Sequence, residues 1–178
     1  MRDPRTMAAL LRAEIDAVLA DWAWHLDHGD YAAVAGLFTE DALFVTGAVE
    51  LRGRSAIENR YTQREHVRTT RHTYSGLRVS VADGSAPGGA GSAADGSAPS
   101  GAGIGVGSST GLGARPARVR ALSTWVNYAV NRPAPVDDVG VYLVADFHDV
   151  LAWCADDRWR ISERRIIPVF RDPSRAPA

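Results

Sequence analysis

Residues 139–171, VGVYLVADFHDVLAWCADDRWRISERRIIPVFR, decide the fold. Two runs within this stretch, 139–155 and 158–171, are rich in valine, isoleucine and aromatic residues, and charged residues separate them. Such runs are typical of β-strands, and a short polar interruption is typical of a tight turn. The stretch therefore predicts two long strands joined by a turn, with Trp159 opening the second strand and packing inward.

Two earlier segments, 70–82 and 116–131, have the same strand-like composition. Together with the first two they predict four long, mostly antiparallel strands. A short apolar run at 42–45 fits one further strand.

The N-terminal residues have a helical pattern instead. Apolar side chains recur at spacings of three and four over 6–28, which predicts one amphipathic helix. Asp30 is placed to cap a short second helix, and Ser55 with Glu58 has the capping-box spacing that would open a third helix through about Arg68. Helices first and long strands afterwards indicate an α+β fold, a cone-shaped curved sheet packed on three N-terminal helices. The open mouth of such a cone is a natural pocket.

Residues 83–114 differ from the rest of the chain. They hold 11 of the 17 glycines, and 83–94 is nearly duplicated in 95–106. The repeat has no hydrophobic face to bury, and its composition is typical of a flexible linker. We expect a single domain over 1–178, interrupted by a flexible hairpin loop at 83–114.

Composition excludes several classes of function. The net charge of −1 argues against a nucleic-acid binder that neutralises phosphates, and a chain without lysine cannot form a Schiff base through a side-chain amine. The single Cys154 excludes an internal disulfide, and no further cluster joins His25 and His28 in a metal site. Neither a membrane-spanning run nor a signal-peptide pattern is present, so we expect a cytoplasmic protein without membrane or metal partners.

His72 and Asp27 are the first candidates for chemistry. Strand alternation places His72, Tyr74, Gly76 and Arg78 on one face, and a histidine in a pocket is a general base when a carboxylate orients it. Asp27 stands at the end of the first helix, where the helix dipole disfavours an acid, so another interaction is expected to hold it. The alternatives are that His72 has a backbone partner only and that Asp27 caps the next helix.

Aromatic residues supply the second set of candidates. Trp22, Trp125 and Phe147 are placed to line a pocket for a planar, apolar ligand. Asn127, two residues from Trp125 on the same strand face, would add a polar contact.

Short motifs spread over nearly the whole chain outside 83–114 support one resemblance. They are Asp27 with Asp30-Tyr31, Leu37-Phe38-Thr39-Glu40-Asp41-Ala42, Gly53-Arg54-Ser55-Ala56-Ile57, Thr70-Arg71-His72, Leu77-Arg78-Val79, and Trp159-Arg160-Ile161 with Arg164-Arg165. In order and spacing they resemble the SnoaL-like branch of the NTF2-like superfamily. The Thr70-Arg71-His72 strand and the end of the chain are also similar to the β subunits of ring-hydroxylating dioxygenases.

The resemblance implies an NTF2-like, cystatin-like α+β barrel that forms a homodimer or homotrimer. Its enzymes include scytalone dehydratase, bile-acid dehydratases, ketosteroid isomerase and polyketide cyclases, which perform acid–base chemistry without a cofactor. In the dehydratase branch a histidine and an aspartate form the catalytic pair, and His72 and Asp27 match them. The active-site tyrosine of that branch falls at Trp22, and a family carboxylate falls near Asp149 or, with a shifted register, Asp146. The expected substrate contacts are Trp22, Tyr31, Trp125, Asn127, Phe147 and Asp149.

Two functions follow as hypotheses. In the first, the protein is a cofactor-independent dehydratase, isomerase or cyclase for a hydrophobic polyketide-like, steroid-like or aromatic small molecule, with His72 and Asp27 as the catalytic pair. In the second, it is a non-catalytic scaffold similar to a dioxygenase β subunit, or a small-molecule-binding module. The histidine and aspartate would then be structural polar groups, paired because an unpaired buried charge is unfavourable.

Overall fold

A computed structural model of the protein describes residues 3–63, 67–82, 115–137 and 139–176. The predicted loop at 83–114 lies outside the described residues, as do residues 64–66 near the predicted end of the third helix. The elements are α1 (Pro4–Asp27), α2 (Tyr31–Gly36), β1 (Phe38–Thr46), β2 (Val49–Arg52), α3 (Arg54–Thr62), β3 (Thr69–Val81), β4 (Arg118–Val130), β5 (Val141–Trp153), β6 (Trp159–Arg171) and a 3-10 helix (Pro173–Arg175).

The first two helices form as the sequence predicts. Asp3 caps α1 by accepting a hydrogen bond from the backbone N–H of Thr6. Gly29, with a φ of 75°, follows the end of the helix in a conformation that favours glycine. Asp30 then caps α2 by accepting from the backbone N–H of Ala33, as expected.

The predicted start of the third helix is wrong. Helix α3 begins at Arg54, and the residue at its N-cap is Gly53, which has no side chain to form a cap. The backbone N–H of Gly53 donates to the carbonyl of Ala42 at 2.8 Å, and its φ of 85° turns the chain directly into the helix. Because this contact with β1 sets the turn, the capping-box spacing at Ser55 is not used.

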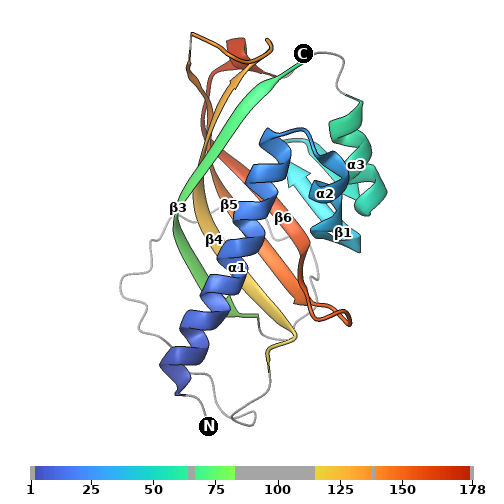
Figure 1. Cartoon of the computed structure of the whole chain (residues 1–178), viewed down its shortest axis with the longest axis vertical. Coiled ribbons are helices and arrows are strands. Elements are labelled where there is room, and N and C mark those ends of the chain that lie inside the picture. The colour runs from blue at the N-terminus through green and yellow to red at the C-terminus, as the bar shows by residue number, and fades with distance from the viewer. Residues whose placement is uncertain (1–2, 64–66, 83–114, 138, 177–178) are drawn as a thin grey trace.

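All four predicted long strands are present as β3, β4, β5 and β6, each of 13 residues, and the short predicted strand lies within β1. They form one six-stranded sheet in the order β2-β1-β6-β5-β4-β3, antiparallel except between β1 and β6. The sheet is curved and unclosed, and α1 crosses one face of it with α2 and α3 beside β1 (Figure 1). The cone-shaped α+β arrangement is confirmed, with β3 at one free edge.

A bulge in β3 corrects the predicted face of this strand. The register with β4 shifts between Ser75 and Arg78, where β3 has one more residue than its partner, and Gly76 there has a φ of 66°. Strict alternation placed Arg78 on the face of His72, and this is wrong. The extra residue turns Leu77 into the core instead and leaves Arg78 exposed.

The core lies between α1 and the concave face of the sheet. Trp22 of α1 packs edge-on against Trp125 of β4 and Phe147 of β5, with ring centroids 5.4 and 5.8 Å apart. Trp159 opens β6 and is buried, as expected. Within the described residues no helix is long and apolar enough to cross a membrane.

Candidate active site

Asp27 and His72 are joined at the place where the end of α1 meets β3. The Nδ1 atom of His72 lies 2.6 Å from Oδ1 of Asp27, and the backbone N–H of His72 donates to Oδ2 at 2.7 Å. The hydroxyl of Thr70 also donates to Oδ1, at 2.7 Å. The side chains of His72 and Asp27 are only 6% and 5% exposed, so both are removed from water.

The contacts of Asp27 explain why an acid ends α1. An acid at a helix C-terminus is disfavoured by the dipole by about 0.3–1 kcal/mol, whereas hydrogen bonds to a charged group contribute about 1.5–3 kcal/mol each. The three donors from His72 and Thr70 therefore outweigh the dipole. Capping of α2 is performed by Asp30, not by Asp27.

The electrostatics of the pair assign its protonation. Burial raises the pKa of the Asp27 carboxyl, but the hydrogen bonds and charge of His72 and the Thr70 hydroxyl together lower that pKa below its ordinary value. Asp27 is therefore ionised, and the Nδ1 of His72 carries the shared hydrogen. In a neutral imidazole this leaves the lone pair on Nε2, an atom to which no described residue donates. The arrangement is that of a histidine oriented as a base.

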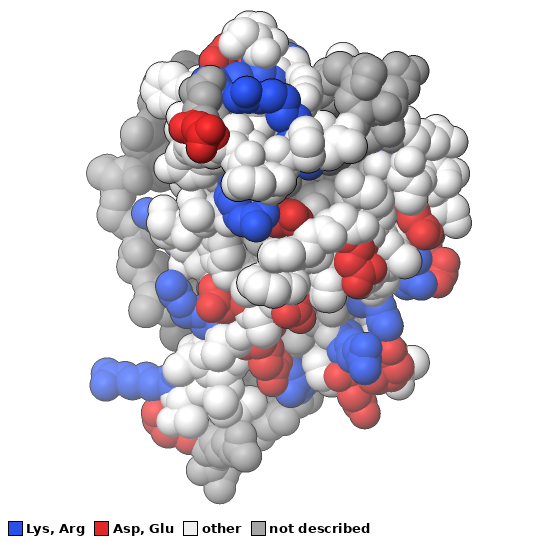
Figure 2. Space-filling view, turned by 45° about the horizontal axis from the view of Figure 1, so that its top comes forward, with Lys and Arg blue, Asp and Glu red and all other residues white. Residues whose placement is uncertain are grey.

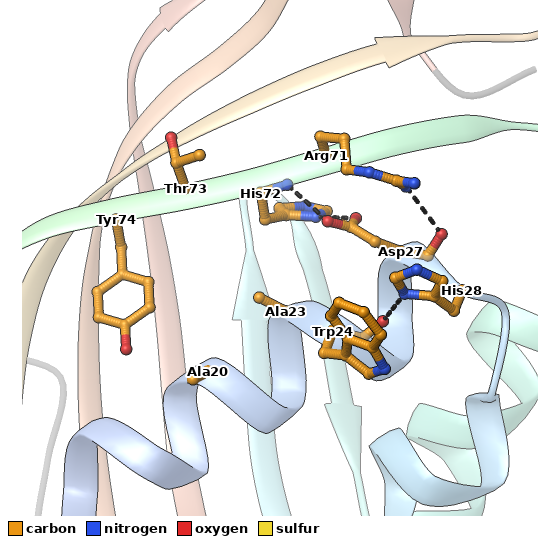
Figure 3. A pocket seen from close by; sticks show the side chains of 9 residues that line it. All are labelled: Ala20, Ala23, Trp24, Asp27, His28, Arg71, His72, Thr73 and Tyr74. Atoms are coloured by element: carbon orange, nitrogen blue, oxygen red, sulfur yellow. Dashed lines mark hydrogen bonds and ion pairs between the residues drawn. The ribbon is translucent and has the colours of Figure 1, made fainter. Parts of the chain in front are cut away.

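A pocket of about 320 Å³ opens beside this pair, between α1 and the edge strand β3 (Figure 3). We call it the α1–β3 pocket. Its lining residues are Ala20, Ala23, Trp24, Asp27, His28, Arg71, His72, Thr73 and Tyr74. The two alanines present only methyl groups, which leaves space where β3 has no neighbouring strand.

Tyr74 brings a phenol to the α1–β3 pocket that sequence reasoning did not single out. Its hydroxyl donates to the carboxylate of Asp16 at 2.8 Å and lies 3.0 Å from the carbonyl of the same residue. Burial and the neighbouring carboxylate of Asp16 raise the pKa of Tyr74. Tyr74 thus remains a protonated phenol. Strand alternation placed Tyr74 on the face of His72 without giving it a role, and both residues line the α1–β3 pocket.

Three predicted contact residues lie together behind the pair. The Trp22 ring is 5.4 Å from the His72 ring, and Trp125 stacks on Phe147 at 4.8 Å. These three side chains are at most 3% exposed and form an aromatic wall inside the sheet. Asn127 is directly opposite His72 in the β3–β4 register.

The remaining two predicted contacts lie elsewhere. Tyr31 begins α2 and stacks on Tyr61 of α3, with ring centroids 5.9 Å apart, outside the lining of the α1–β3 pocket. Asp149 is 2% exposed in the core, where both of its oxygens bind the guanidinium of Arg164. This pair was not predicted. The facing positions of the two residues on β5 and β6 are the signal, but they require the register of the hairpin.

The surface charge and the arrangement of possible metal ligands were compared with the sequence predictions. Acidic and basic side chains are interspersed on the face that Figure 2 shows. Among the residues described, no group of three or more histidine, cysteine, aspartate or glutamate side chains is arranged to hold a metal ion.

Fold and site together define the class of protein: an α+β protein with the NTF2-like, cystatin-like arrangement and a buried histidine–aspartate pair. The family model of the SnoaL-like domain matches residues 7–165, and the chain belongs to this family. The expected resemblance is thus confirmed. Comparison with curated proteins finds no match.

Similar solved structures share the fold across most of their length. An aspartate-to-asparagine variant of Rv3472 from Mycobacterium tuberculosis, of unknown function, is 21% identical over 97% of this chain and 79% of that one, with a TM-score of 0.67. A proposed scytalone dehydratase from Novosphingobium aromaticivorans is 15% identical over 94% and 90%, with a TM-score of 0.66. The β subunit of a proposed aromatic-ring-hydroxylating dioxygenase from the same organism is 13% identical over 93% and 94%, with a TM-score of 0.61.

Proposed function

We propose that this protein is a cofactor-independent acid–base enzyme, a dehydratase, isomerase or cyclase for a hydrophobic polyketide-like, steroid-like or aromatic molecule. The observation that carries this proposal is the 2.6 Å contact between Asp27 and the Nδ1 of His72 beside a pocket of about 320 Å³. The pair orients an imidazole whose other nitrogen is left for a substrate. A volume of this size is within the range of small-molecule sites.

The reaction begins with proton abstraction. Nε2 of His72 removes a proton from a carbon next to a carbonyl, the electron pair of that C–H bond forms a carbon–carbon double bond, and the carbonyl oxygen takes up negative charge. Asp27 stays ionised and stabilises the imidazolium. The imidazolium then gives its proton to a departing hydroxyl, which leaves as water, or to another carbon in an isomerisation. Such catalysis contributes about 10²–10⁴-fold to a rate.

The surroundings favour a hydrophobic substrate. The lining of the α1–β3 pocket includes two alanines and Trp24, and the Trp22 ring, which is not part of that lining, contacts the ring of His72. Exclusion of water by such groups strengthens the interaction between His72 and Asp27. The similar fold of a proposed scytalone dehydratase supports this class of chemistry.

Hydrogen–deuterium exchange tests the proposal without knowledge of the natural substrate. The protein is incubated with 1-tetralone or 2-tetralone, two enolisable aromatic ketones, in D₂O, and deuterium at the carbon next to the carbonyl is followed by NMR. We expect the wild-type protein to accelerate exchange and His72→Gln to lose about 10²-fold or more of this acceleration. His148→Gln is the matched control, because His148 is an exposed histidine on β5. Equal rates for wild type and His72→Gln would exclude His72 as the base.

A scaffold role is the second candidate, and the similar fold of a dioxygenase β subunit favours it. In that role the hydrogen bonds between Asp27 and His72 only hold the end of α1 against β3. In the exchange assay, the wild-type protein, His72→Gln and His148→Gln would then all give the rate of buffer alone. In co-purification, the protein would form a stable complex with a separate catalytic subunit.

A further inference from the structure

Arg71 lines the α1–β3 pocket next to the proposed base, and no acidic side chain in the described part of the chain forms an ion pair with it. It belongs to β3 and is an exposed residue. Its side chain reaches from β3 to the end of α1, where Trp24 and His28 also line the pocket (Figure 3). A cation at the edge of a cavity is accessible to a ligand, so the contacts of its nitrogens decide what it can bind.

One nitrogen of Arg71 is committed to the backbone. Nη1 donates to the carbonyl of Thr70 at 2.7 Å and to the carbonyl of Asp27 at 3.2 Å. The Asp27 carbonyl is at the C-terminus of α1, where the helix dipole attracts a cation. These contacts hold the side chain but leave Nε and Nη2, to which none of the described residues offers an acceptor. Attraction to the end of the helix therefore does not account for this edge of the guanidinium.

The same edge of another arginine binds a carboxylate in this protein. In Arg164, Nε and Nη2 each donate to one oxygen of Asp149, both at 2.8 Å. Two parallel donors of this kind match the two oxygens of a carboxylate. Arg160 resembles Arg71 in donating to a backbone carbonyl, but its other nitrogens bind both oxygens of Asp156. Arg71 is held by carbonyls in a similar way and lacks the acid.

Asp27 does not supply the acid that Arg71 lacks. Its carboxylate is engaged by His72 and by the hydroxyl of Thr70, and only its backbone carbonyl contacts Arg71. Asp27 is also the sole carboxylate among the described residues that line the α1–β3 pocket. The acid that would complete the contacts of Arg71 therefore has to come from a bound molecule.

Arg71 borders enough space for such a molecule. It lines both the α1–β3 pocket, of about 320 Å³, and a second cavity of about 250 Å³. Trp24 adds an aromatic surface to the α1–β3 pocket, since it is 65% exposed and stacks on His28 with ring centroids 4.0 Å apart. The pocket thus combines a surface for a planar ring, the proposed base and a cation without an acid.

We propose that Nε and Nη2 of Arg71 bind a carboxylate of the substrate, so that the substrate is an aromatic keto acid. This inference rests on the proposed function, which requires the enolisable ketone, and adds the negative charge. Arg71 selects and holds the substrate while His72 removes the proton. A phosphate monoester would bring almost two negative charges, and the described lining holds no second arginine to balance them.

Binding of 1-tetralone-3-carboxylate and of its methyl ester, which has the same ring and ketone without the charge, tests the proposal. Isothermal titration calorimetry is expected to give about tenfold tighter binding of the acid by the wild-type protein. The difference should shrink when NaCl is raised from about 0.05 M to about 0.5 M, because salt screens an exposed charge. Equal affinity for acid and ester, or a preference that salt does not reduce, would overturn the proposal.

Variants at two arginines of β3 assign the preference. Arg71→Gln is expected to bind acid and ester equally, whereas Arg78→Gln, at an exposed arginine outside the pocket lining, should retain the preference. Arg71→Lys keeps the charge but loses the two-donor edge, and we expect it to reduce the preference by about threefold. It gives a result even where Arg71→Gln does not fold. An unchanged preference in either folded Arg71 variant, or an equal loss in Arg78→Gln, would overturn the proposal.

The exchange assay and this binding test fail independently, because calorimetry requires no reaction. A preference for the acid together with normal exchange by His72→Gln would overturn the role of His72 and leave the Arg71 site standing. Loss of exchange in His72→Gln without any preference for the acid would do the reverse.

Discussion

Two buried ion pairs of this protein have similar geometry and different chemistry. The Asp27 carboxylate forms hydrogen bonds with the ring nitrogen and the backbone N–H of His72, at 2.6 and 2.7 Å. The Asp149 carboxylate accepts two hydrogen bonds from the guanidinium of Arg164, at 2.8 Å each. The first pair lines the α1–β3 pocket, whereas the second is closed in the core. A histidine can release its proton near neutral pH, and an arginine cannot. The first pair is thus suited to move protons and the second to hold a fixed charge.

The largest expected effect concerns the stability of the closed pair. Arg164→Met alone should lower the free energy of unfolding by about 3–5 kcal/mol, because the Asp149 carboxylate is left buried without its partner. The double variant with Asp149→Leu should recover most of this loss. Urea denaturation followed by tryptophan fluorescence measures both, and a single variant as stable as wild type would show that the core tolerates the lone carboxylate.

The next largest effect concerns proton transfer at the open pair. Asp27→Asn should reduce deuterium exchange of the tetralones by about 10²-fold or more, because an amide places an N–H group against one of the donors of His72 and loses the charge that stabilises the imidazolium. NMR of the ketone measures the rate. Asp30→Asn is the control, since Asp30 is an exposed helix cap outside the α1–β3 pocket. Full activity of Asp27→Asn would leave the pair with a structural role.

A smaller effect is expected in the pH dependence of stability. The pKa of Asp27 is lowered in the folded protein, so the folded state favours the carboxylate more than the unfolded state does. Its stabilisation is complete above the ordinary aspartate pKa of about 3.9 and is lost as the pH falls through the lower folded value. Urea midpoints from pH 7 down to pH 2 should therefore fall more steeply for wild type than for Asp27→Asn. Parallel slopes would contradict the assigned interaction.

The smallest expected effect tests one hydrogen bond of the open pair. Thr70→Val removes the hydroxyl that donates to Asp27 and keeps the shape of the buried side chain. We expect a loss of about 1 kcal/mol of stability and a shift of the Asp27 pKa toward its ordinary value, because one donor to the carboxylate is gone. Carboxyl ¹³C NMR titration measures the pKa. A matched Thr124→Val change, at an exposed threonine that bonds Asp146, should leave the Asp27 pKa unchanged.

Much of the fold could be predicted because its elements have strong local patterns. The long strands are rich in β-branched and aromatic residues, and α1 has apolar side chains at helical spacing. The failures are local features set by distant contacts. Helix α3 begins at Arg54 because Gly53 is bound to β1, and the inward face of β3 changes because of the bulge at Gly76. Neither the contact nor the register is visible in a single segment.

The His72–Asp27 and Arg164–Asp149 pairs also differ in how far a local sequence pattern could predict them. Asp27 could be singled out because an acid at the end of a helix is locally unfavourable, and His72 because it stands at the start of a strand within the Thr70-Arg71-His72 motif. Arg164 carries no such local sign. Its partner Asp149 faces it across β5 and β6, and the register of that hairpin shifts between Val150 and Leu151. The buried Asp149–Arg164 ion pair could therefore be identified only from the register of the paired strands.

The sequence by itself determined the α+β class, the four long strands and the identity of one candidate base with one candidate carboxylate, because propensity and periodicity act within a segment. Only the tertiary structure decided that Asp27 and His72 meet at 2.6 Å, and that Trp22 contacts both His72 and Arg164. These contacts join residues far apart in the chain. They depend on strand register and on the packing of α1 against the sheet, and no local pattern encodes either.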